Sequence, residues 1–281
     1  MILAANVSRL NDSVETFLVK DPSHILMITE AHVTKQRAPD VQNRFLQKGW
    51  KSQMTHARAN PKSQAGRAAV SSNADPGSAS TGGSMVAMRS WLTSAGQWTL
   101  SGGHNAGFAE AGLHDVAISF WRSSGLTIML VAMYLLPQQH GKLDAGCFHR
   151  LKYVAKLIEQ TKLPYIIYGD WNVDQATLEA TGWTALIHGE VVSAGRPSTT
   201  SGSEIDYFVV AKAILPAVGT PSVTTGTLDA TLRAGAGSPP ATQGANDLQV
   251  GQATQASSCH GTRHALAGLP AHGRSFSSQM A

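Results

Sequence analysis

Four short apolar segments, each with a polar residue at or just after its end, most restrict what this chain can fold into. Short apolar runs that polar or turn residues interrupt predict buried β-strands. Groups at the ends of packed strands are held rigidly and can meet at one edge of a sheet, which a preorganised site requires. The segments, each with its polar residue, are Ile2 to Asn6 (Asn6), His24 to Thr29 (Glu30), Leu126 to Leu135 (Tyr134) and Tyr165 to Tyr168 (Asp170).

Helices and further strands alternate with these segments, and this alternation predicts an α/β fold. Asp12 with Glu15 resembles a capping box and predicts the start of a helix. Apolar residues at helical spacing predict a second helix over about residues 142–161. The remaining predicted strands are Ser84 to Met88, His114 to Trp121, which pairs with the Leu126 segment, and Ile205 to Val210.

Asp206, in the segment Ser203 to Tyr207, adds a fifth polar residue to the four at the strand ends. Taken alone, Glu30 is explained as a surface residue, Tyr134 as a core aromatic, and Asp206 as a partner for loop backbone. A carboxylate beside a long apolar run is costly to bury unless it is paired or bound to metal. The occurrence of all five residues in this order therefore predicts a single site.

Two motifs resemble signatures of the endonuclease/exonuclease/phosphatase superfamily. The segment Gly169-Asp170-Trp171-Asn172 is similar to the family's Gly-Asp-Phe-Asn motif, and Ser203 to Tyr207 matches its Ser-x-Ile-Asp-Tyr motif. The resemblance covers about Met1 to Pro216. It implies the DNase I-like fold, a four-layer α/β sandwich of two mixed β-sheets flanked by helices. Looser matches to three earlier family motifs are Asn6-Val7, Thr29 to His32 and Tyr134 to Pro137.

The resemblance also implies a metal-dependent hydrolysis of phosphodiesters and a role for each candidate residue. Glu30 is the expected main ligand of Mg²⁺ or Mn²⁺ with Asn6 beside it, and oxygen ligands suit such hard cations. Asp170 is expected to align or deprotonate the attacking water. The other implied roles are phosphate orientation by Asn172, a hydrogen bond from Tyr134 to a phosphate oxygen, and support of a catalytic histidine by Asp206.

The chain departs from the family pattern at the last motif, Ser-Asp-His. The corresponding region, Thr227 to Thr231, contains Asp229 but no histidine. The nearest downstream histidines are His260 and His264, within a segment of low complexity. We therefore expect Asp206 to lack its partner and the strand that normally carries this motif to be absent. Loss of such a group typically reduces catalysis by ~10²–10⁴-fold.

Composition divides the chain into two parts. Residues 1–215 are the predicted endonuclease/exonuclease/phosphatase-like domain, with a flexible basic insertion at about 57–81. Residues 216–281 contain a single aromatic residue, Phe276. So few large apolar side chains cannot offset the entropy of ordering the chain, and this part is predicted to be a disordered tail.

The charge distribution favours a polyanionic partner. The net charge is +4, and Ala31 to Ser90 contains nine Lys and Arg against two acidic residues. Nucleic acid, DNA or RNA, is the favoured partner, because cationic side chains gain from counterion release. A phosphoinositide or another phosphorylated small molecule is the alternative substrate. A catalytically inactive polyanion-binding module or a retroelement-derived endonuclease remnant also fits these features.

Cysteine content and hydropathy bear on location. Two cysteines cannot build a disulfide framework, which favours an intracellular protein without specifying a compartment. The longest apolar run, Leu126 to Pro137, is too short to cross a bilayer, so no transmembrane segment is predicted.

Overall fold

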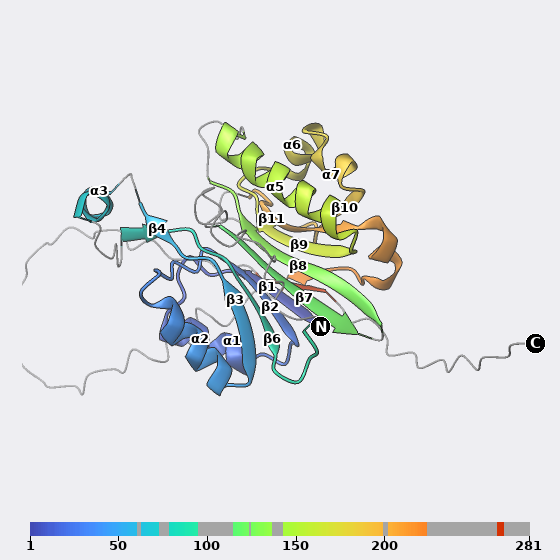
Figure 1. Ribbon diagram of the computed structural model, residues 1–281. Helices are drawn as coiled ribbons and strands as arrows, with labels where there is room; N and C mark the ends of the chain where they lie inside the picture. The colour runs from blue at the N-terminus through green and yellow to red at the C-terminus, as the bar shows by residue number, and fades with distance from the viewer. Residues whose placement is uncertain are drawn as a thin grey trace, which may run out of the picture.

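Two β-sheets packed face to face form the centre of the protein, and helices cover their outer faces (Figure 1). This four-layer α/β sandwich of mixed sheets is the predicted fold class, which is confirmed. The computed structural model describes residues 1–60, 63–72, 79–94, 115–123, 125–136, 143–198, 202–223 and 263–266.

The six-stranded sheet has the strand order β12-β13-β1-β2-β6-β3. β1 and β2 run parallel, with Ile2 opposite Ile25 and Asn6 opposite Thr29, and the other neighbours are antiparallel. Helices α1 (Asp12–Lys20) and α2 (Ala38–Gln47) cover its outer face. Its strands are β1 (Ile2–Asn6), β2 (Ile25–Thr29), β3 (Trp50–Met54), β6 (Met85–Arg89), β12 (Ser222–Val223) and β13 (Arg263–Leu266).

The five-stranded sheet has the strand order β10-β11-β9-β8-β7. β8 and β9 are parallel, and the other neighbours are antiparallel. Figure 1 shows α5 (Ala145–Thr161), α6 (Gln175–Ala180) and α7 (Trp183–Leu186) on its outer face. The sheet's strands, and the 3-10 turn that follows them, are β7 (Val116–Ser123), β8 (Leu126–Tyr134), β9 (Tyr165–Asp170), β10 (Gly189–Val192), β11 (Asp206–Ala211) and η3 (Lys212–Ala217).

Both faces of the central strands are buried, which explains why the sequence of these strands is apolar throughout. Side chains alternate across a strand, so Ala4 and Met27 enter the core between the two sheets. Leu3 and Leu26 enter a second core beneath α1 and α2. The apolar runs therefore position the strand ends by packing on both sides.

The first helix begins differently from the prediction. Asn11, rather than Asp12, is its N-cap, and the Asn11 side chain accepts a hydrogen bond from the Val14 amide at 2.9 Å. Glu15 does not close a capping box, because its carboxylate binds Arg44 of α2 at 2.7 Å. The capping-box prediction is therefore wrong, although the helix itself is present.

The range 57–81 contains regular elements among its described residues. They are a two-stranded sheet of β4 (Arg58–Ala59) and β5 (Ser80–Thr81), and helix α3 (Gln64–Ser72). In Figure 1 β4 and α3 project at one side of the molecule. None of the helices within the described ranges is long and apolar enough to cross a membrane.

Two strands from beyond residue 215 belong to the six-stranded sheet. β12 pairs with β13, and β13 pairs antiparallel with β1, placing His264 opposite Ala4. The expected place of the final motif, residues 227–231, lies outside the described residues. β13 comes from a later segment and pairs with β1, whose edge offers backbone groups for hydrogen bonds. The rest of the predicted tail, residues 224–262 and 267–281, lies outside the described residues and includes Asp229 and His260.

Candidate active site

The strand ends of both sheets bring the predicted polar residues together. In the five-stranded sheet, Asp170 is in register with Tyr134 of β8 on one side and with Asp206 of β11 on the other. In the six-stranded sheet, Asn6 ends β1 and Glu30 directly follows β2. Because β1 and β2 are parallel, Asn6 and Glu30 lie at the same end of that sheet.

Asp170 joins the two sheets through its hydrogen bonds. Asn6 Nδ2 donates to Asp170 Oδ2 at 2.6 Å. Asn172 Nδ2 donates to Asp170 Oδ1 at 2.9 Å and to the Leu135 carbonyl at 2.8 Å. Asn6 Oδ1 accepts from the Ser8 amide at 3.1 Å, so both ends of the Asn6 amide are fixed in orientation. Asp170 is buried and fully oriented by these partners.

Glu30 faces Tyr134 across the site. The Glu30 carboxylate lies close enough to Tyr134 for its negative charge to act on the hydroxyl. Burial, followed by the negative charges of Glu30 and Asp170, raises the pKa of Tyr134 well above its usual value. Tyr134 therefore keeps its proton and remains a hydrogen-bond donor at neutral pH.

Two residues of the site have left-handed backbone conformations, which are uncommon for residues other than glycine. Glu30 has φ 53° and Asn172 has φ 51°. Such conformations are found mainly where the surrounding structure imposes them, often at functional sites. They turn the chain sharply just beyond β2 and β9. The turns lie at the edge of the two sheets where Asn6, Tyr134 and Asp170 also lie, and this edge is called the mouth of the site below.

The buried Trp171 fixes the segment that carries Asp170 and Asn172. Its ring stacks on Tyr207 with centroids 5.5 Å apart, and its Nε1 donates to the Tyr207 carbonyl at 2.9 Å. A Cβ on Gly169 would collide with the Trp171 ring, so glycine is required there. The tryptophan in place of the family's phenylalanine thus fastens β9 to β11 directly below the two polar residues.

The carboxyl groups of the site repel one another in a buried setting. Burial raises the pKa of Asp170 well above its usual value, and the charges of Asp206 and Glu30 raise it further. Burial also raises the pKa of Asp206 to about 7, although hydrogen bonds from Ser198 and Tyr168 oppose this. The Tyr168 hydroxyl donates to Asp206 Oδ1 at 3.3 Å. Among the described residues, no Lys or Arg forms an ion pair with any of the three carboxylates.

The donor set at this mouth suits a hard divalent cation. Its candidate ligands are carboxylate and amide oxygens, which Mg²⁺ and Mn²⁺ prefer. Within the described ranges, no three His, Cys, Asp or Glu side chains gather closely enough to hold a metal by themselves. A cation here would be held by Glu30, with Asn6 beside it and water completing the shell, and Mg²⁺ usually keeps several waters.

β13 carries His264, which the sequence analysis named only as a histidine of a low-complexity segment without a place in the site. The register of β13 on β1 places it opposite Ala4, two residues before Asn6. The sequence signal is a histidine followed directly by Ala265 and Leu266 within a polar segment. That signal is weak without the pairing to β1, which defines the strand.

Comparison of the sequence with protein-family models and with curated proteins finds no match. Solved structures do match. The endonuclease domain of TRAS1, a telomere-specific non-LTR retrotransposon, matches with 14% identity and a TM-score of 0.53, over 95% of this chain and 97% of its own. The AP endonuclease LMAP from Leishmania major matches with 12% identity and a TM-score of 0.53, over 79% of this chain and 82% of its own.

A third match is an endonuclease/exonuclease/phosphatase family protein from Leptotrichia buccalis C-1013-b. Its identity is 11% and its TM-score 0.50, over 79% of this chain and 91% of its own. At these identities the likeness concerns the fold. The chain therefore has the DNase I-like fold of the endonuclease/exonuclease/phosphatase superfamily, as the motifs predict.

Proposed function

We propose that this protein is a metal-dependent phosphodiester hydrolase that acts on nucleic acid. The observation that carries the proposal is the hydrogen bond from Asn6 of one sheet to Asp170 of the other, with Glu30 close enough for its charge to act on Asp170. Two sheets that contribute polar groups to one buried mouth create a preorganised electrostatic environment, which is the main source of catalysis in phosphoryl chemistry.

Each of the site residues has a proposed role that its surroundings allow. Asp170, which Asn6 and Asn172 hold in place, orients and deprotonates the attacking water. Asn172 orients the phosphate, and Tyr134 donates its proton to a phosphate oxygen in a hydrogen bond. Glu30 and Asn6 would hold Mg²⁺ or Mn²⁺, which would supply positive charge for the leaving oxygen.

We also propose that His264, which β13 brings to the edge of β1, fulfils the role of the family's final histidine. The pairing of β13 with β1 supports this proposal, because it sets His264 two residues from Asn6 in register. Arg263 stands where the family has an aspartate. The chain therefore has no acidic residue at this position, and we still expect a reduced rate of hydrolysis.

Cationic side chains near the mouth favour nucleic acid over a small phosphorylated substrate. Arg9 lies on the loop that follows β1, and the exposed Lys35 and Arg37 lie on the segment that follows β2. A polymer with a repeating phosphate charge can contact several such residues at once and release several counterions.

A catalytically inactive module that binds polyanions is the second candidate. It is favoured by the lack, within the described residues, of three metal-ligating side chains of the His, Cys, Asp and Glu types in one cluster. Such a module would have the same basic surface but would show no turnover with any metal.

A cleavage assay decides between these candidates. The full chain is incubated with abasic double-stranded, intact double-stranded and single-stranded DNA in Mg²⁺, Mn²⁺ or EDTA, beside Glu30→Gln and Asp170→Asn. The matched control is Asp174→Asn, an exposed aspartate four residues from Asp170 that caps α6. Metal-dependent cleavage that both site variants lose and the control keeps supports the hydrolase. Salt-sensitive binding without cleavage supports the module, and hydrolysis of a phosphoinositide alone overturns the choice of nucleic acid.

A further inference from the structure

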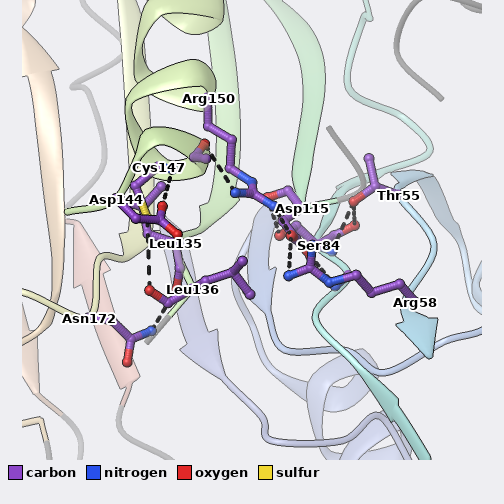
Figure 2. A network of polar contacts seen from close by, with 12 residues as sticks. Thr55, Arg58, Ser84, Asp115, Leu135, Leu136, Asp144, Cys147, Arg150 and Asn172 are labelled. Carbon is purple, nitrogen blue, oxygen red and sulfur yellow. Dashed lines mark hydrogen bonds and ion pairs between the residues drawn. The ribbon is translucent and has the colours of Figure 1, made fainter. Parts of the chain in front are cut away.

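A buried ion pair outside the predicted site lies where the two sheets meet. Asp115, directly before β7, is fully buried, and Arg150 of α5 donates from Nη2 to Asp115 Oδ2 at 2.8 Å. Arg58 of β4 approaches the same oxygen, with Nη2 at 3.4 Å. Figure 2 shows the two guanidinium groups converging on Asp115 from different elements. These three residues are called the Asp115 junction below.

Asp115 also holds backbone from both sheets. Its Oδ1 accepts from the Gly83 amide at 3.1 Å, and its carbonyl accepts from Ser84 Oγ at 2.9 Å. The same carbonyl accepts from the Tyr134 amide at 2.9 Å. Gly83 and Ser84 lead into β6 of the six-stranded sheet, whereas Tyr134 ends β8 of the five-stranded sheet. One residue thus fixes the spacing between a site residue and the opposite sheet.

Backbone hydrogen bonds connect Gly82 and Gly83 to the segment that carries Glu30. The Ala31 amide donates to the Gly83 carbonyl at 3.0 Å, and the His32 amide donates to the Gly82 carbonyl at 3.0 Å. Glu30 and His32 both have left-handed backbones, with φ 53° and 52°. Such a strained turn persists only when its surroundings hold it. The hydrogen bonds to the Gly82 and Gly83 carbonyls stabilise this turn.

Gly82 shows how closely the junction is fitted to this turn. It has φ 77°, and a Cβ there would collide with Asp115 Oδ1. The approach of backbone to carboxylate at this point therefore excludes every residue with a side chain. A buried ion pair is itself a poor source of stability, because desolvation offsets the attraction. A geometric task explains the presence of Asp115 and Arg150 better than stability does.

We propose that the Asp115 junction positions the Glu30 carboxylate for metal binding and the Tyr134 hydroxyl beside it, so that Asp115 and Arg150 are positioning residues of the site. The proposal rests on the proposed function, since it takes Glu30 as the metal ligand. Groups that orient a metal ligand typically contribute ~10–100-fold to metal affinity. Loss of the junction should therefore weaken metal binding in a protein that is still folded.

The test measures the dissociation constant of Mn²⁺ for the full chain from the electron paramagnetic resonance signal of free Mn²⁺. The double variant Asp115→Asn with Arg150→Met keeps the volume of the pair and leaves no buried charge without a partner. Circular dichroism and a thermal melt establish that it is folded. We expect Mn²⁺ to bind about 10–100-fold more weakly than to the wild type. Arg150→Lys, which keeps the charge, should show a smaller loss.

Two further variants separate positioning from general destabilisation. Gly82→Ala leaves all charges in place but displaces Asp115, and it should weaken Mn²⁺ binding in the same direction even if the double variant does not fold. Glu15→Gln breaks a partly buried ion pair far from the junction, Arg44 with Glu15 between α1 and α2, and it should leave Mn²⁺ affinity unchanged.

The outcomes separate this proposal from the proposed function. Wild-type Mn²⁺ affinity in a folded double variant, or in a folded Gly82→Ala, overturns the positioning role while the hydrolase remains intact. Equal losses in Glu15→Gln and the junction variants also overturn it, because the effect would then be destabilisation. A wild type that neither binds Mn²⁺ nor cleaves DNA removes the proposed function, and the positioning role falls with it.

Discussion

The two sheets contribute to the site in different ways. The five-stranded sheet carries Tyr134, Asp170 and Asp206 on adjacent strands, and the register of β8, β9 and β11 aligns them directly. The six-stranded sheet supplies Asn6 and Glu30, but Glu30 follows its strand on a left-handed turn. The half proposed to contact phosphate is therefore set by strand pairing, and the half proposed to bind metal depends on loop backbone and on the Asp115 junction.

The two halves also differ in how local they are in the chain. The five-stranded sheet is built from residues 116–211, whereas the six-stranded sheet combines strands from residues 2–89 with β12 and β13 from beyond residue 221. Contacts between distant parts of the chain form at a larger entropy cost. The six-stranded half should accordingly be the more sensitive of the two to changes far from the site.

The largest expected effect separates chemistry from metal binding. Asp170→Asn removes the proposed base and should lower kcat by ~10³–10⁴-fold, because a positioned base contributes on this scale. It should leave Mn²⁺ affinity within about tenfold, since Glu30 is untouched. Glu30→Gln should instead weaken Mn²⁺ binding first. Steady-state kinetics at several metal concentrations distinguish the two, and matching losses in kcat and metal affinity for both variants would refute this division of tasks.

The next effect concerns the pH dependence of stability without metal. Because the folded pKa of Asp206 is raised to about 7, the folded state keeps a proton that the unfolded state releases between about pH 4 and 7. Stability from this group is present at low pH and is lost as pH rises through that window, by on the order of 4 kcal/mol. Urea unfolding at pH 5 and pH 8 covers about two units of that window and should show roughly 3 kcal/mol of the loss in the wild type. Asp206→Asn should lose less, because only Asp170, whose pKa is also raised, still contributes. Saturating Mg²⁺ should reduce the loss, and a wild type that gains stability relative to Asp206→Asn as pH rises would show the sign to be wrong.

A smaller effect tests the contribution of the distant strand β13. His264→Ala should lower kcat by about 10²-fold, at the low end for a charge-stabilising group, because Arg263 stands in place of the family's aspartate. Asp206→Asn should give a similar loss. If the two residues act together, the double variant should be little worse than either one, since effects of paired residues are not additive. Rates that multiply in the double variant would show that His264 and Asp206 are independent.

The smallest effect is on the stability of the five-stranded half. Gly169→Ala forces a Cβ into the Trp171 ring, and overpacking of this kind costs about 2 kcal/mol. A thermal melt should show a lower Tm. The control is Gly125→Ala in the β7–β8 turn, where an added Cβ meets nothing and only the positive φ of 83° opposes it. An unchanged Tm for Gly169→Ala would mean that Trp171 moves aside and does not fasten β9 to β11.

Much of the fold follows from local sequence because the central strands are buried on both faces. β1 has the predicted bounds, and β2, β8, β9 and β11 differ from prediction by one or two residues. β3 was not predicted, since Trp50 alone among its residues is fully buried and the others give it a polar pattern. β13 could not be predicted either, because four residues in a low-complexity segment become a strand only by pairing with β1.

The site likewise contains residues that the sequence predicts and residues that only the structure identifies. Asp170, Asn172 and Asp206 occur in motifs with fixed neighbours, so a sequence reader finds them. Asp115 and Arg150 are 35 residues apart with no local pattern, and their pairing depends on how α5 crosses the five-stranded sheet. Gly82 and Gly83 indicate only a turn in the sequence, and the structure shows why Gly82 must be glycine, because Asp115 approaches its Cα closely.

The central claim is that side chains from both sheets meet around one divalent cation, and crystals soaked in Mn²⁺ test it most directly. The anomalous difference map should show a peak within about 2.3 Å of a Glu30 carboxylate oxygen, on the side of the mouth that Asn6 and Asp170 share. Crystals in which Glu30 and Asp170 lie apart, or in which Mn²⁺ at millimolar concentration gives no peak at Glu30, would contradict the account.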